Sequence, residues 1–238
     1  MSANVSLLNM RLRARELADM QTSNQAAAFV TDAELTNAVN RHLKQLYNLL
    51  IIARGDEYYA ATTAFAIGGS SANLPLLVPA FMALLSLSAT DGRRVVWVPK
   101  FNLKQWAELV YQQNTSTAEL DDYRYRLMGN SLEIRPGVVN VSHSFTLHYL
   151  PAFVPLVLDG DVFDGVNGWE DWAIYGAAID MLNKEESLEQ ANSLMAQRAQ
   201  LEGQITKLAG ARDAGMPEVV GDTMKDWDNY SQRNRWQA

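Results

Sequence analysis

The stretch YRYRLMGNSLEIRPG, residues 123–137, has the pattern of a β-hairpin. Apolar and polar side chains alternate on both sides of Gly129 and Asn130, as they do in strands with one buried face. A Gly-Asn pair between two such runs is typical of a two-residue hairpin turn, and Pro136 ends the second strand. The turn predicts a register in which burial and charge agree, pairing Leu127 with Leu132, Tyr125 with Ile134, and Arg126 with Glu133.

Other segments around this hairpin also alternate with a period of two. We expect strands at Ser144–Leu150 and Arg93–Val98, and a weaker one within Asp56–Ile67. Together with the hairpin they predict a small antiparallel sheet of four or five strands, with a short helix from Leu103 to Tyr111 beside it. The segment GGSSANLP, residues 68–75, lacks the Lys and Ser or Thr of a phosphate-binding loop, so we interpret it as a turn.

Helical patterns occupy the N-terminal part of the chain. The sequence TDAE, residues 31–34, is a capping box, and Val30 and Leu35 have the spacing of a hydrophobic staple. These signals predict a helix that ends at Arg54 and Gly55, preceded by a second helix over about Val5–Met20. The apolar stripe of the capped helix consists of Leu35, Val39, Leu43, Leu46 and Leu50.

A second pair of helices is predicted near the C-terminus. Asn167 has the position of a helix cap before WEDWAIYGAAIDML, residues 169–182, whose small residues favour close approach of another helix. Ser187 begins the next helix, and so short a connection predicts an antiparallel helical hairpin that packs on the first pair. The apolar positions expected in this last helix are Leu194, Met195, Leu201, Ile205 and Leu208.

The predicted fold class is therefore α+β. N- and C-terminal helices form a bundle from residues 1–55 and 167–208, and a small antiparallel β-domain, residues 56–166, is inserted between them. Residues 209–238 have no periodicity and are predicted to form an extended C-terminal arm. The arm contains three isolated aromatic residues in a polar segment: Trp227, Tyr230 and Trp236. Such residues are typical of interfaces, so we expect the arm to bind a partner. The alternative is that the arm folds back onto its own domain.

Composition excludes several classes of function. The chain has 238 residues, 48% of them hydrophobic, and no cysteine, so a disulfide framework, a thiolate metal site and a Cys nucleophile are excluded. A net charge of −7 argues against a sequence-specific nucleic-acid-binding protein. The one basic cluster, RLRAR at residues 11–15, is expected on a solvent-exposed helix face. We expect no membrane span, because the apolar stretch 74–87 is short and contains two prolines.

No catalytic, cofactor-binding or metal site is predicted. His42, His143 and His148 lack helical metal-ligand spacing, and a structural or surface role is expected for each. The segment DGDVFDG, residues 159–165, contains clustered carboxylates, but Phe163 replaces the ligand that an EF-hand loop requires at its fifth position. We interpret this segment as an acidic connector. A carboxylate-dependent hydrolase would have to use Asp159, Asp161 or Asp164.

The order of these motifs resembles the head-to-tail adaptor, or connector, proteins of tailed bacteriophages. The resemblance covers about residues 5–208, and neither the loop 91–122 nor the arm has a counterpart in it. The motifs, in order, are TDAEL at 31–35, YRLMGNSLEIRPG at 125–137, FTLHYLP at 145–151, WEDWAIYGAAIDML at 169–182 and EQANSLMAQRAQLEGQI at 189–205.

The resemblance implies a structural virion protein of the neck region, not an enzyme, that is assembled in the host cytoplasm. Such adaptors form a homo-oligomeric ring, typically of twelve copies, below the portal protein, where they extend the DNA channel and dock tail tube or nozzle proteins. Twelve copies would carry 12 × −7 = −84 charges, which suits a channel through which DNA slides without sequence-specific binding. Another neck or tail-completion protein, or a small carboxylate-dependent hydrolase, remains the alternative.

Overall fold

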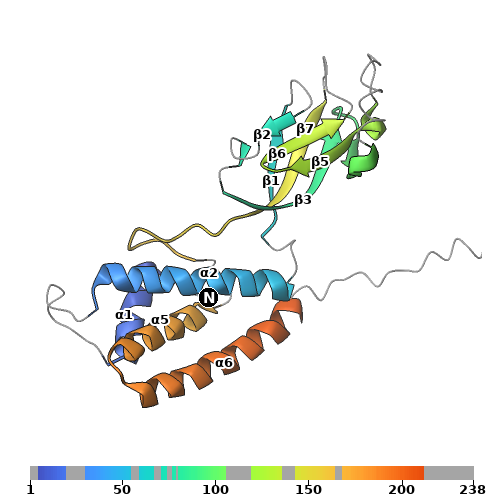
Figure 1. The fold of residues 1–238 in the computed structure, drawn as a ribbon. Helices are drawn as coiled ribbons and strands as arrows, with labels where there is room; N and C mark the ends of the chain where they lie inside the picture. The colour runs from blue at the N-terminus through green and yellow to red at the C-terminus, as the bar shows by residue number, and fades with distance from the viewer. Residues whose placement is uncertain are drawn as a thin grey trace, which may run out of the picture.

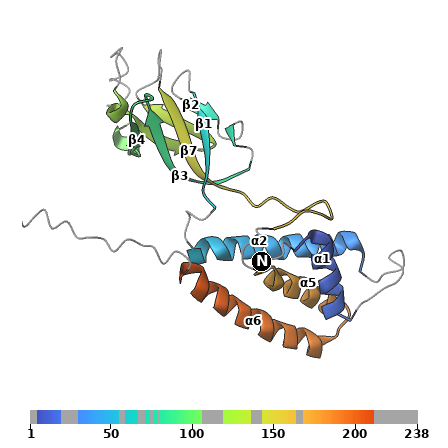
Figure 2. The same cartoon turned by 180° about the vertical axis from the view of Figure 1, so that it is seen from behind.

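The structure is a computed structural model that describes residues 5–19, 30–54, 59–66, 71–73, 77–78, 80–105, 119–135, 143–163 and 168–211. These residues form four α-helices and two antiparallel sheets, so the predicted α+β class is confirmed. Helices and strands occupy separate regions of the molecule (Figure 1). The view from behind shows the same separation (Figure 2).

Four helices pack around one apolar core. They are α1 (Leu7–Leu17), α2 (Asp32–Arg54), α5 (Glu170–Lys184) and α6 (Leu188–Ala211). Because α5 contacts the other three helices, its apolar residues are buried on several sides. The core includes Leu7, Met10, Leu35, Leu43, Leu46, Leu50, Trp172, Ile174, Leu182, Leu194 and Ile205.

The start of α2 has the predicted capping box. The Thr31 backbone N–H donates to Glu34 Oε2 at 3.0 Å, and the Glu34 N–H donates to Thr31 Oγ1 at 3.2 Å. Glu34 also accepts from Lys184 Nζ of α5 at 3.0 Å, so the cap links both helices. Both residues of the predicted staple, Val30 and Leu35, are buried, and so is the whole predicted stripe of α2.

The C-terminal helices differ in detail from the prediction. Helix α5 begins at Glu170 after Trp169, whereas the predicted cap, Asn167, lies outside the described residues. In α6 the expected positions Leu194 and Ile205 are buried and Leu201 packs partly buried against the core, but Leu208 is 56% exposed and Met195 is also exposed. The expectation for these last two residues was wrong, because α6 packs along one narrow face.

In the described part of the β-region, seven strands form two sheets. The strand order in the first sheet is β1 (Ala61–Phe65), β7 (Ser144–Pro151), β3 (Phe81–Thr90) and β4 (Val95–Val98). The strand order in the second sheet is β2 (Ser71–Asn73), β6 (Ser131–Arg135) and β5 (Arg124–Met128). The two sheets are joined where the Phe101 N–H donates to Tyr125 O and the Tyr125 N–H donates to Pro99 O, both at 3.0 Å. Their shared core includes Phe65, Leu87, Tyr123, Tyr125, Leu132, Ile134, Phe145 and Leu147.

The hairpin of β5 and β6 has the predicted register. Leu127 pairs with Leu132, Tyr125 with Ile134, and Arg126 with Glu133. Gly129 has φ +59°, the left-handed conformation that the two-residue turn requires and that glycine adopts without strain. The pattern of alternation and the turn residues were therefore sufficient to fix this pairing.

Other parts of the β-region were predicted incompletely. Strand β3, the longest of the seven, was missed, and residues 71–73 form β2 instead of belonging only to a turn. As a result, seven strands in two sheets replace the expected single sheet of four or five. Of the expected helix Leu103–Tyr111, the described part is a 3-10 turn at Leu103–Gln105, and the remainder lies outside the described residues.

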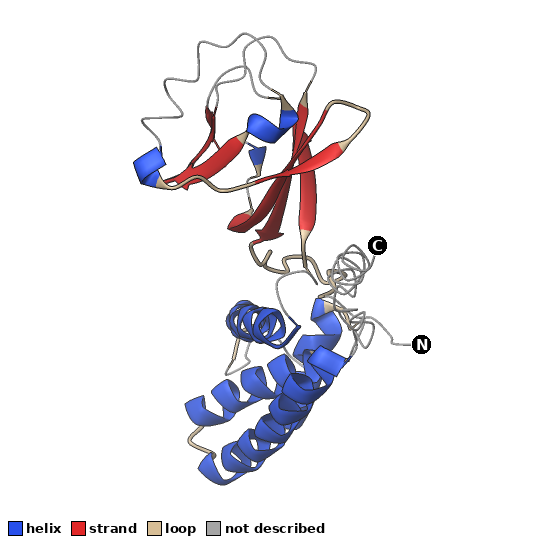
Figure 3. Cartoon of the chain, turned by 90° about the vertical axis from the view of Figure 1, so that its right-hand side faces the viewer, coloured by secondary structure: helices blue, strands red, loops and turns tan. Residues whose placement is uncertain are grey.

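The chain returns from the strands to the helices through residues 152–163, which we call the connector. Asn40 of α2 holds it with two hydrogen bonds, donating to Leu156 O at 2.9 Å and accepting from the Leu156 N–H at 2.8 Å. Tyr47 Oη donates to Pro151 O at 2.7 Å. Figure 3 shows the strands and helices on either side of this junction. The junction therefore rests on α2.

Candidate functional site

The predicted partner-binding residues Trp227, Tyr230 and Trp236 lie outside the described residues. Their role thus stays a prediction. Among the described residues, the candidates for a functional site are the acidic connector, the basic cluster, the histidines and the exposed apolar surface.

The carboxylates of the connector have structural partners. Asp161 Oδ2 accepts from the backbone N–H groups of Val157 and Leu158, both at 2.8 Å, and these hydrogen bonds lower the pKa of Asp161. Asp159 is ion-paired with Arg11 of α1. A general acid in a hydrolase requires a raised pKa, which is the opposite of the shift at Asp161. The third candidate carboxylate, Asp164, lies outside the described residues.

The basic cluster of α1 is not simply a solvated face. Arg15 is buried and donates to both Val30 O at 2.9 Å and Asp32 Oδ1 at 2.8 Å. Arg11 pairs with Asp159 and Arg13 with Asp171. The expectation of an exposed basic face was therefore wrong for Arg15, and the three arginines instead link α1 to α2, to the connector and to α5.

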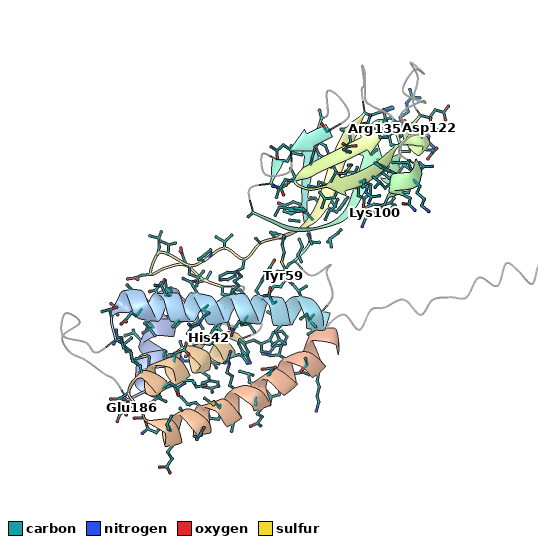
Figure 4. All side chains as sticks on the ribbon, viewed as in Figure 1. His42, Tyr59, Lys100, Asp122, Arg135 and Glu186 are labelled. Carbon is teal, nitrogen blue, oxygen red and sulfur yellow. The ribbon has the colours of Figure 1, made fainter. Side chains whose placement is uncertain are left out.

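The three histidines have different surroundings. His148 on the outer face of β7 lies 3.1 Å from Ser88 Oγ and packs against the Trp97 ring at 4.9 Å between centroids. His143 Nδ1 lies 3.2 Å from Tyr123 Oη. His42 of α2 is buried among the helices (Figure 4). Within the described part of the chain, no group of three or more His, Asp or Glu residues could hold a metal ion.

His42 is the centre of a polar cluster inside the bundle. Its Nε2 lies 2.7 Å from Asp180 Oδ2, and Arg198 Nη2 lies 3.1 Å from its Nδ1. Gln45 Oε1 lies 3.0 Å from the same Nδ1, so this nitrogen faces both the guanidinium and an amide oxygen. Asp180 also pairs with Arg41. Burial alone would raise the pKa of Asp180, but the hydrogen bond from His42 and the ion pair with Arg41 lower it.

The cluster explains the small residues of α5. A Cβ atom built on Gly176 would lie 2.6 Å from both Cγ and Nδ1 of the His42 ring. Only glycine lets α2 approach α5 this closely, which confirms the close packing that the small residues predicted. The ring also packs edge-on against Trp172, at 6.5 Å between centroids. Helices α2, α5 and α6 are thereby held in one arrangement.

An open groove of about 530 Å³ lies between α2 and α6, beside this cluster. Trp172 of α5 contributes to its lining, with the Arg198 guanidinium stacked 3.7 Å from the ring centroid. Trp172 Nε1 donates to Glu202 Oε2 at 3.3 Å. We call this feature the α2–α6 groove; its lining consists of Gln45, Asn48, Leu49, Ile52, Trp172, Met195, Arg198, Ala199 and Glu202.

Exposed apolar side chains gather where α1 meets the connector. The connector runs against the start of α1, since the Leu7 N–H donates to Asp161 O at 2.8 Å and the Leu8 N–H to Asp159 O at 3.1 Å. Here Val157 is 76% and Leu158 68% exposed. We call this surface the connector patch; it consists of Leu8, Leu12, Val157, Leu158 and Val162. The sequence does not predict this patch, because its residues have the pattern of ordinary core positions until the packing is known.

Comparisons with known proteins do not assign the chain to a family: no family model matches the sequence, and no curated protein is found as a relative. Among the described residues, no helix has both the length and the apolar character needed to cross a membrane.

Proposed function

We propose that the chain is a structural subunit of a tailed-bacteriophage particle, a head-to-tail adaptor that assembles into a ring below the portal protein. The order of sequence motifs supports this proposal. A capped N-terminal helix, a Gly-Asn hairpin and two C-terminal helices are all present in the structure, and they lie in the order in which the adaptor resemblance has them.

The connector patch is the observation that carries the proposal. Val157 and Leu158 project from a turn held by Asp161, so their exposure is built into a defined piece of backbone. Exposed apolar side chains grouped in this way are typical of protein–protein interfaces. In a ring, the patch of one subunit would be covered by its neighbour, through a heterologous contact that repeats around the ring and closes it.

The arm and the channel complete the proposed mechanism. The C-terminal arm docks on the portal or on a neighbouring subunit through Trp227, Tyr230 and Trp236, and the tail proteins bind the opposite face of the ring. The net charge of −7 per subunit disfavours tight binding of DNA phosphates, so DNA passes through the channel without being held. Assembly by surface complementarity then requires neither a cofactor nor a catalytic group.

Electron microscopy of the purified chain, alone and mixed with the portal protein encoded in the same genome, tests this function. A ring stacked on the portal is expected. A chain that stays monomeric and ignores the portal would contradict the proposal. A ring that binds tail components but not the portal would instead favour another neck or tail-completion protein.

A matched pair of variants tests the role of the connector patch in the same assay. Leu158→Asp places a charge in the patch and should abolish ring formation, because a buried unpaired carboxylate is strongly unfavourable. Val95→Asp places the same charge at a 67% exposed position on β4, far along the chain from the patch, and should leave the rings intact. Rings formed equally by both variants would show that the patch is not the subunit interface.

A further inference from the structure

The α2–α6 groove is open and apolar at a place where the bundle could have been closed. Ile52 at its edge is 81% exposed, and Met195 on the opposite side is also exposed. Trp172 and Leu49 continue the apolar lining between them. The volume of about 530 Å³ lies within the roughly 300–1,000 Å³ of ordinary ligand pockets, which is enough for a large side chain.

The position of the groove in the bundle indicates what fills it. Its lining comes from the C-terminal half of α2 and from residues 195–202 of α6. The ends of α2 and α6 lie side by side in both opposite views (Figures 1 and 2). Helix α6 extends to Ala211, three residues into the segment predicted as the C-terminal arm, and the chain continues as residues 212–238. The groove therefore lies between the C-terminal part of α2 and the middle of α6, the helix that leads into the arm.

The length of chain between Ala211 and Trp227 matches the distance from Ala211 back to the groove. At about 1.5 Å per helical residue, residues 202 and 195 lie about 14 Å and about 24 Å back from Ala211. Trp227 is the first aromatic residue of the arm, about sixteen residues after Ala211. For a segment of that length, the random-coil relation gives a root-mean-square end-to-end distance of roughly 22 Å. Effective concentration is greatest when the linker span equals the distance to be covered, so Trp227 is favourably placed to reach this groove in its own chain.

The chemistry of Trp227 fits the lining. An indole ring provides a large apolar surface at a low entropic cost, because only two side-chain torsions are fixed. Its N–H can donate to the amide oxygens of Gln45 or Asn48, which line the groove. The side chains of Ile52 and Met195 would be covered in the same step, which removes exposed apolar surface from water.

We propose that the α2–α6 groove is the docking site for the C-terminal arm of the same chain, with Trp227 inserted between Ile52 and Met195. Docking in the free subunit goes beyond the proposed adaptor function, because it requires neither a ring nor a portal. If both hold, the portal or a neighbouring subunit competes with the groove for Trp227, so the arm is withheld until that partner is present.

Engineered disulfides can test the docking, because the natural chain contains no cysteine and each introduced pair is unique. The test pair combines Ala199→Cys, in the groove, with Asn229→Cys in the arm. The control pair combines Gln200→Cys with the same Asn229→Cys. Ala199 and Gln200 are both exposed and adjacent in α6, but Gln200 points about 100° further around the helix, away from the groove. Reaction of each thiol with a small disulfide reagent corrects for intrinsic reactivity.

The test pair is expected to form its intramolecular disulfide at least about tenfold faster than the control pair, equivalent to about 1.4 kcal/mol. Adding Trp227→Ala should reduce the rate of the test pair to that of the control, whereas Trp227→Phe should keep most of the difference. Equal rates for the two pairs, or no effect of Trp227→Ala, would overturn the proposal. A disulfide-linked dimer as the main product in dilute solution would overturn it in favour of exchange between copies.

The outcome is separable from that of the adaptor proposal. If microscopy shows no rings but the test pair forms its disulfide quickly, the adaptor function is refuted and the proposed docking of the arm still holds. Rings on the portal with equal disulfide rates would do the opposite. Far-UV circular dichroism of every variant confirms that the helices are formed before the rates are compared.

Discussion

Replacing Gly176 by alanine should destabilise the helical bundle, although the same change normally stabilises a helix. Gly176 lies inside α5, where alanine is favoured over glycine by about 1 kcal/mol. The added methyl group, however, would lie 2.6 Å from the ring of His42. Asp180 and Arg198 contact the two ring nitrogen atoms from opposite sides, so moving the ring away from the methyl group would disturb these contacts.

The expected size of the effect follows from these contacts. Forcing an extra methyl group into a packed core costs about 1–3 kcal/mol. Displacing the ring also weakens its hydrogen bond to the Asp180 carboxylate, and hydrogen bonds to charged groups contribute about 1.5–3 kcal/mol. After subtracting the helix-propensity gain of about 1 kcal/mol, we expect Gly176→Ala to lower the free energy of unfolding by about 1.5–5 kcal/mol.

Urea unfolding followed by the helical circular dichroism signal measures this change. Gly203→Ala is a matched control, because Gly203 also lies inside a helix but has nothing within 4 Å of the added Cβ. We expect the control to stabilise α6 by up to about 1 kcal/mol. In the double variant His42→Ala/Gly176→Ala the methyl group fits, so the two changes should be strongly non-additive. Equal and stabilising effects of both glycine substitutions would refute the packing argument.

Three further predictions concern other contacts. Thr31→Ala removes the hydroxyl that caps Glu34, and should lower the free energy of unfolding by about 1 kcal/mol, whereas Thr31→Ser should have little effect in the same urea titration. Two backbone hydrogen bonds lower the pKa of Asp161 from 3.8, so this carboxylate contributes stability above about pH 4 that is lost as the pH falls through the folded pKa. The acid-induced drop in the urea midpoint should therefore be smaller in Asp161→Asn. An unchanged drop would contradict the role of these hydrogen bonds. Tyr47→Phe removes the hydrogen bond to Pro151 O and should cost about 1 kcal/mol while increasing hydrogen exchange at the junction, and unchanged exchange there would show that Tyr47 does not hold it.

Local signals in the sequence were sufficient for part of the fold. The capping box at Thr31 and the Gly129-Asn130 turn are short motifs whose geometry is determined within a few residues, so the start of α2 and the pairing of β5 with β6 could be predicted. The same is true of the small residues around Gly176, whose purpose is to admit another helix.

Signals that depend on distant packing could not be used in the same way. Strand β3 contains the run FMALLSLSAT, whose first five residues are all apolar, and periodicity alone does not separate such a run from a buried helix. The buried face of α6 differs from the expected stripe because it is determined by α2 and α5, not by α6 itself. The roles of Arg11, Arg13 and Arg15 required knowledge of which carboxylates lie opposite them.

The surfaces used in the proposals belong to this second class. Ile52 and Leu158 have the sequence pattern of core residues, and only the three-dimensional arrangement shows that they are exposed. The patterns predicted an aromatic arm but not the α2–α6 groove proposed as its docking site, because α2, α5 and α6 form that groove together.

The insertion of the strands between two halves of the bundle has a consequence for synthesis of the protein on the ribosome. The apolar stripe of α2 is covered by α5, and about 116 residues separate Arg54 from Glu170. At about 5–20 residues per second, roughly 6–23 seconds pass before α5 is made. During that interval the nascent α2 has no partner for most of its stripe, whereas the strands between them are complete and can fold first. Chaperones that protect apolar nascent segments should therefore bind the α2 region until the C-terminal helices emerge.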